Sequence, residues 1–182
     1  KRFTKSRGLE TVDVTPLAIP YNKQTFNENP RYYQQVAIRR ALEAISKGQN
    51  RILLNLATGT GKTNISFQIV WKLKQSNKIR RALFLADRNV LRDQAFNTFE
   101  PFGNARGYIE NGEAPTARDI YFSIYQAMWG EKGSNPIFEQ YPKDFFDLVI
   151  IDECHRSGFG KWNEILQHFS GAIHLGMTAT PK

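Results

Sequence analysis

The hydrophobic and polar positions of this chain predict strands that alternate with helices. Short apolar runs are typical of strands covered on both faces. We expect such strands at residues 51–55, 81–86, 120–124, 146–151 and 172–177, with a shorter candidate at 103–109. Apolar residues at helical spacing, together with turn and cap residues, predict helices at residues 30–48, 64–74, 89–99, 125–129 and 161–169. This alternation predicts an α/β fold, a mainly parallel sheet with helices on both faces.

The first part of the chain has a different pattern. Residues 1–29 contain Pro16, Pro20 and several charges but no sustained periodicity, so we interpret them as a lead-in or linker segment. Residues 30–182 then form one domain, which is a comfortable size for a single core. The absence of an initial Met suggests a piece of a longer polypeptide. In the long loop at residues 130–143, we expect Phe138 and Tyr141 to anchor the loop to the body rather than to stack on bases.

The stretch LATGTGKT at residues 56–63 lies between the first predicted strand and the next helix. Gly59 and Gly61 can take backbone angles that aim amide N–H groups at one point, where the helix N-terminus adds positive charge. Lys62 is placed to reach outer phosphates, and the Thr63 hydroxyl to join the coordination of Mg²⁺. The strict phosphate-loop pattern needs Gly where this chain has Leu56, so the flanking strand and helix carry the prediction. The alternative is a Gly-rich turn with a solvated lysine.

Composition narrows the class of protein only a little. The net charge of +8 and the pI of about 9.7 fit a polyanionic partner, but nucleotide, nucleic acid and anionic membrane all satisfy that condition. The single cysteine, Cys154, excludes an internal disulfide and suits a reducing cytosol. No apolar run approaches membrane-spanning length and no signal-peptide core is present, so we expect a cytoplasmic protein with no membrane partner.

Chemically active residues follow the predicted strands at the edge where parallel sheets bind ligands. Asp152 and Glu153 come directly after an apolar strand. We expect Asp152 to bind Mg²⁺ near Thr63, and Glu153 to orient and deprotonate an attacking water. A solvated turn or a helix-capping acid is the alternative. His155 either links this pair to the turn that follows Thr178 or is an ordinary turn histidine.

Three motifs in this order, LATGTGKT at 56–63, DECH at 152–155 and TATP at 178–181, resemble the first motor domain of superfamily-two helicases and translocases of the DExH type. The resemblance implies a RecA-like P-loop NTPase domain that binds ATP with Mg²⁺, with Lys62, Asp152 and Glu153 as catalytic residues. It implies that Thr63 and Asp152 serve the metal, and that His155, Thr178 and Thr180 couple the sites. The implied nucleotide-binding residues are Arg31, Gln34, Thr58, Gly59, Thr60, Gly61, Lys62 and Thr63.

Within RYYQ at residues 31–34, Gln34 resembles the family's adenine reader. A glutamine amide can both donate to and accept from the adenine edge, which gives the resemblance a physical basis. The alternative is a polar residue that opens a helix.

Within that superfamily, ADRNVLRDQ at 86–94, YQA at 125–127 and DECHRS at 152–157 look most like the motor (R) subunit of type I restriction enzymes. Such subunits translocate duplex DNA and cut it with a separate nuclease domain, for which residues 1–29 hold no convincing constellation. The implied partners are duplex DNA, a second RecA-like domain of the same polypeptide, and methylation and specificity subunits. Arg88 falls in the element that approaches the DNA backbone. A salt bridge to Asp87 or a helix end is its alternative role.

Two other functions remain open from the sequence. One is another superfamily-two DNA or RNA helicase, such as a repair helicase. The other is a nucleotide-gated DNA-binding module without turnover, although a pure switch does not need Glu153. On the first interpretation, the chain alone binds Mg-nucleotide weakly and hydrolyses it near background, because the resembling motors take an arginine finger from their second domain.

Overall fold

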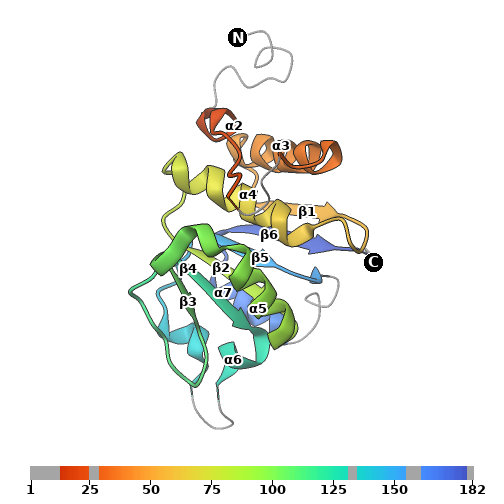
Figure 1. The fold of residues 1–182 in the computed structure, drawn as a ribbon. Coiled ribbons are helices and arrows are strands. Elements are labelled where there is room, and N and C mark those ends of the chain that lie inside the picture. Colours follow the sequence, from red (N-terminus) through yellow and green to blue (C-terminus); the bar gives the residue numbers. More distant parts are fainter. Residues whose placement is uncertain (1–12, 25–28, 131–134, 155–160, 180–182) are drawn as a thin grey trace.

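The computed structural model describes residues 13–24, 29–130, 135–154 and 161–179. Within these ranges six parallel strands form one sheet in the order β1-β6-β5-β2-β4-β3 (Figure 1). The strands are β1 (Arg51–Asn55), β2 (Ala82–Ala86), β3 (Arg106–Tyr108), β4 (Ile120–Ile124), β5 (Leu148–Ile151) and β6 (Ile173–Thr178). Each predicted strand is present, so the predicted parallel α/β sheet is confirmed.

Helices connect the strands in the predicted alternation. They are α2 (Thr15–Ala18), α3 (Tyr32–Ser46), α4 (Lys62–Gln75), α5 (Asn89–Thr98), α6 (Tyr125–Trp129) and α7 (Lys161–His168), with short 3₁₀ helices η1 (Glu100–Ala105) and η2 (Ile137–Gln140). Two details differ from the sequence-based expectation. The short helix α2, with Pro16 in its first turn, was not predicted. Helix α4 begins at Lys62, two residues early, because Gly61 in the left-handed conformation lets the helix start directly after it.

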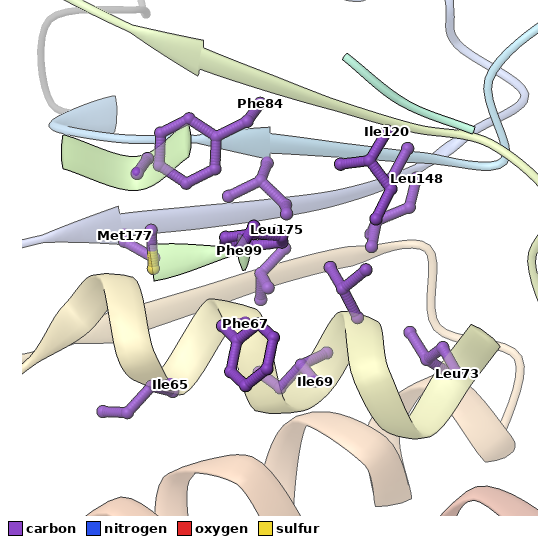
Figure 2. Packing of buried hydrophobic residues seen from close by; sticks show 14 of the residues in the cluster. Ile65, Phe67, Ile69, Leu73, Phe84, Phe99, Ile120, Leu148, Leu175 and Met177 are labelled. Atoms are coloured by element: carbon purple, nitrogen blue, oxygen red, sulfur yellow. The ribbon is translucent and has the colours of Figure 1, made fainter. Parts of the chain in front are cut away.

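The sheet separates two apolar layers. Along β2, Phe84 faces the layer of α3, α4 and α5, while Leu83 and Leu85 face the layer of α6 and α7. This alternation is the period of two that a strand buried on both faces must show. Figure 2 shows Leu175 and Met177 of β6 between the sheet and α4. Both layers hold the strands rigidly, so the residues at the strand ends have fixed positions.

The described part of the predicted lead-in, residues 13–24, packs against α3 and α4. Within the interior, the Asn22 backbone N–H donates to Gln68 Oε1 over 3.0 Å, and Gln68 Nε2 donates to the Asn22 carbonyl over 2.8 Å. The Lys72 ammonium group donates to the Ile19 carbonyl, and burial lowers the pKa of Lys72 to about 8. The segment is therefore tied to the body at several points, while the division of the chain at residue 29 stays a prediction.

Two aromatic residues of the long loop at 130–143 are buried. Phe138 is 3% exposed and Tyr141 2%, and both pack in the layer with α6 and α7. The prediction that they anchor the loop, and do not stack on bases, is confirmed. Among the described residues, no helix combines the length and the apolar composition needed to cross a bilayer.

Candidate functional site

The strand order brings the four chemistry-bearing segments together at one edge of the sheet. Strands β1, β6, β5 and β2 are consecutive neighbours, and their carboxyl ends carry these segments. The Leu56 backbone N–H donates to the Thr178 carbonyl over 2.9 Å, and the Asp152 N–H donates to the Leu85 carbonyl over 3.0 Å. Backbone hydrogen bonds of the sheet therefore fix the phosphate loop beside the end of β6 and the acidic pair beside the end of β2.

The loop at residues 56–63 has the geometry of an anion site. Gly59 and Gly61 have positive φ of 78° and 79°, a conformation that other residues rarely adopt. The first turn of α4 contains no acidic residue, so the positive end of the helix is open to an anion. Thr58 is exposed, and Thr60 fixes the turn by donating its hydroxyl to the Ala57 carbonyl over 2.7 Å.

Lys62 and Glu153 face the same space. The Lys62 Nζ lies 3.0 Å from Glu153 Oε1, although the two residues are 91 positions apart. The side chains are 13% and 28% exposed, so both groups are within reach of a ligand from solvent. The convergence that the sequence predicts for the phosphate loop and the acidic pair is therefore present in the structure.

Asp152 is a buried carboxylate beside this pair. It is 8% exposed, and its Oδ1 accepts a hydrogen bond from the Glu153 N–H over 3.1 Å. Burial and the nearby Glu153 carboxylate raise the pKa of Asp152, while the Lys62 cation opposes that shift. A buried carboxylate under this influence favours an additional cation close by.

The donor set at this point fits magnesium. The described residues contain no cluster of three or more His, Cys, Asp or Glu side chains that could enclose a metal ion. Mg²⁺ bound with nucleotide needs no such cluster, because it keeps several waters and takes one or two protein oxygens along with phosphate oxygens. The Asp152 carboxylate and the Thr63 hydroxyl are oxygen donors of that kind, and their role in holding the metal stays a prediction.

Glu153 has an unusual backbone conformation. Its φ is 49°, in the left-handed region that disfavours side chains with a Cβ. Such strain persists only where the surrounding structure imposes it, and it is concentrated at functional sites. Here it accompanies the turn that aims the carboxylate at Lys62, a feature that no sequence pattern indicates.

A cavity of about 290 Å³ adjoins the phosphate loop on the side of α3. It is lined by Asn29, Pro30, Arg31, Tyr33, Gln34, Gly59, Thr60, Gly61 and Asn64. Gln34 Oε1 accepts from the Arg31 N–H over 2.9 Å, and Gln34 Nε2 donates to the Thr60 carbonyl over 2.8 Å. The amide keeps one N–H and one lone pair for a ligand. Gln34 thus opens helix α3, as the alternative to the adenine role supposed, and also faces the cavity.

The cavity wall depends on a glycine and on two residues that sequence reasoning missed. A Cβ at Gly61 would lie 2.7 Å from Gln34 Nε2, so only glycine fits there. The Tyr33 hydroxyl donates to the Thr60 carbonyl over 3.3 Å, and Asn64 lies in the first turn of α4. The one signal for Asn64 was a polar residue on a face of the helix that is otherwise buried.

Outside this centre the outcomes are mixed. The side chain of Arg88 is 73% exposed, and its Nε lies 3.6 Å from Asp87 Oδ2, so the alternative salt bridge exists while the guanidinium stays accessible. Burial raises the pKa of the Cys154 thiol, which keeps it from acting as a thiolate nucleophile. Thr178 is buried at the end of β6. The other predicted coupling residues, His155 and Thr180, lie outside the described residues.

Comparisons with known proteins point to one group. Residues 27–182 match the family described as "Type III restriction enzyme, res subunit". The chain is 44% identical to the Escherichia coli protein "Type I restriction enzyme EcoAI endonuclease subunit", over 100% of this chain and 23% of that protein. It spans only about a quarter of the length of that relative.

Solved structures agree on the fold. A fragment of a putative HsdR subunit of a type I restriction enzyme from Vibrio vulnificus YJ016 superposes with a TM-score of 0.78 at 42% identity, over 100% of this chain and 31% of that one. The T4 UvsW structure superposes with a TM-score of 0.68 at 19% identity, over 99% of this chain and 34% of that one. These likenesses confirm the RecA-like fold predicted from the three motifs.

Proposed function

Because the chain belongs to the family described as the res subunit of type III restriction enzymes, we propose that it is the ATP-binding motor domain of a restriction enzyme. The 44% identity to a type I endonuclease subunit over the whole chain favours the type I class. The observation that carries the ATPase assignment is the 3.0 Å contact between Lys62 and Glu153, which unites the phosphate loop with the acidic pair.

The residues of the site have distinct roles in this proposal. Nucleotide phosphates bind at the N-terminus of α4, where Lys62 exchanges Glu153 for the more highly charged phosphate oxygens. Glu153 is then free to orient a water molecule and accept its proton. Asp152 and Thr63 would hold Mg²⁺, which supplies positive charge to the transferring phosphate. Gln34 and its cavity receive the adenine base.

Duplex DNA is the proposed substrate on which the motor works. The net charge of +8 favours a polyanion, and the exposed guanidinium of Arg88 stands at the start of α5, at the same edge of the sheet as the nucleotide site. By analogy with the type I relatives, we propose a second RecA-like domain and the methylation and specificity subunits as partners.

The test is the substitution Lys62→Ala. We expect it to abolish the rise in melting temperature that Mg-ADP or Mg-ATP gives the wild-type chain, because the loop loses its phosphate ligand. Without nucleotide the variant stays folded, since a partly exposed ion pair is worth only about 1 kcal/mol or less. Differential scanning fluorimetry at millimolar nucleotide measures both effects.

The matched control for this test is Lys47→Ala, which removes an exposed lysine at the far end of α3. It should respond to nucleotide like the wild type. Equal stabilisation of the Lys62→Ala variant and the wild type would remove the phosphate-loop assignment.

A further inference from the structure

Asn64 holds a hydrogen-bond acceptor without a donor. The residue is 9% exposed, and within the described residues its Oδ1 has no hydrogen-bond partner. Buried polar atoms are nearly always paired, because losing water without a replacement bond is costly. Asn64 is the third residue of α4, where a side chain could turn back to cap the helix, but the helix N-terminus has no side-chain cap. The oxygen therefore has no structural role within the described fold.

The surroundings of Asn64 indicate a ligand. Asn64 lines the cavity of about 290 Å³ that Arg31, Tyr33 and Gln34 also line. This volume is just below the range of roughly 300–1,000 Å³ typical of small-molecule pockets, so it suits a flat base better than a whole nucleotide. Gln34, the amide predicted from the sequence, already bonds the Arg31 N–H and the Thr60 carbonyl. The Asn64 oxygen, by contrast, is entirely available.

We propose that Asn64 determines base specificity, with its Oδ1 accepting a hydrogen bond from the 6-amino group of adenine. This inference rests on the proposed function, since it places the base beside the phosphate loop. A 6-oxo group, as in hypoxanthine or guanine, would set one acceptor against another in a buried place. Sites built to hydrogen-bond a ligand group discriminate strongly against analogues that lack it. Asn64 thereby selects adenine nucleotides over 6-oxopurine nucleotides.

The experiment compares Mg-ADP with Mg-IDP, whose hypoxanthine base carries oxygen in place of the 6-amino group. Calorimetric titration of the full chain should give a dissociation constant for ADP roughly tenfold or more below that for IDP. In Asn64→Leu, which keeps the approximate side-chain volume, the ratio of the two constants should fall by about fivefold or more. The affinity for IDP should stay within about threefold of wild type, because no bond to it is lost.

A second variant and a control keep the test decisive. Asn64→Ala should show the same loss of discrimination, in case leucine disturbs the packing of α4. Ser66→Ala removes another buried polar group of α4, one that bonds the Thr63 carbonyl and does not line the cavity, and should leave the ADP-to-IDP ratio unchanged.

The possible results separate this inference from the proposed function. An unchanged ratio in both Asn64 variants overturns the inference, and so does an equal loss of ADP and IDP affinity, which would mark a purely structural residue. If the ratio falls as expected but Lys62→Ala still binds both nucleotides, base reading stands and the phosphate-loop assignment fails. A wild-type chain that binds neither nucleotide overturns both.

Discussion

Glu153 shows how a single residue can be placed for chemistry at a cost in backbone conformation. The sequence indicates a carboxylate after a buried strand, and the structure adds the positive φ of 49° that accompanies its contact with Lys62. A side chain with a Cβ is disfavoured in this region by about 1–2 kcal/mol. The surrounding turn holds Glu153 there, which favours a role in catalysis over a role in stability.

This strain can be measured by comparing Glu153→Gly with Glu153→Ala. Both variants lose the contact to Lys62 and, on the proposed function, the ability to hydrolyse ATP. Glycine normally destabilises a folded chain relative to alanine, but at positive φ we expect the order to reverse, with Glu153→Gly more stable by about 1 kcal/mol. Urea denaturation of the two variants gives the difference, and a more stable alanine variant would show that the residue is not strained.

At the scale of elements, the strands in the middle of the sheet carry the site. Strands β5 and β6 lie between β1 and β2, so the acidic pair and Thr178 stand between the phosphate loop and Arg88. Helix α3 serves two purposes, because it packs against α4 and β1 and also supplies the cavity wall from its first turn. A disturbance in either element therefore affects stability and the site together.

Strand β6 also contains a buried histidine that makes stability depend on pH. His174 is 5% exposed and its Nε2 lies 2.9 Å from the Phe169 carbonyl oxygen. Burial lowers the pKa of His174 below its ordinary 6.5, and the nearby Arg51 acts in the same direction, against the hydrogen bond to Phe169. The unfolded chain then binds the proton more readily, so the stabilisation is present above about pH 6.5 and is lost as the pH falls.

We therefore expect the free energy of unfolding to decrease between pH 7.5 and pH 5.5 by less in His174→Leu than in the wild type, as roughly 1.4 kcal/mol accompanies each unit of pKa shift. Urea denaturation at several pH values measures it. His168→Gln is the control, because His168 also bonds a backbone carbonyl but from the partly exposed helix α7. If His174→Leu and the wild type show the same pH slope, His174 does not titrate differently in the folded chain.

For the whole molecule, the balance of charge sets the expected behaviour toward DNA. Its 25 basic and 17 acidic residues give a net charge of +8. A positive net charge attracts any polyanion, so it can explain binding but not its location. The location has to come from exposed cations at the edge of the sheet that also holds the nucleotide site, among which Arg88 follows β2 directly.

Arg88→Ala tests that location. If the guanidinium contacts a DNA phosphate, duplex affinity should fall several-fold and the slope of log affinity against log salt should decrease by about 0.9. Fluorescence anisotropy over a salt series gives both values. Arg80→Ala is the control, because Arg80 is exposed at the opposite edge of the sheet, ahead of β2. Should the two variants bind alike, Arg88 serves only its salt bridge to Asp87.

The sequence by itself determined the alternation of strands and helices, the phosphate loop, and the acidic pair at the end of β5. These features are local, because apolar spacing and the residue types at a strand end depend on a few neighbouring positions. Only the tertiary structure decided that Lys62 touches Glu153, that Gly61 leaves room for Gln34, and that the Asn64 oxygen is buried without a partner. Such contacts join residues that different elements carry, so they follow from the packing of the whole sheet and its helices, which no single stretch of sequence contains.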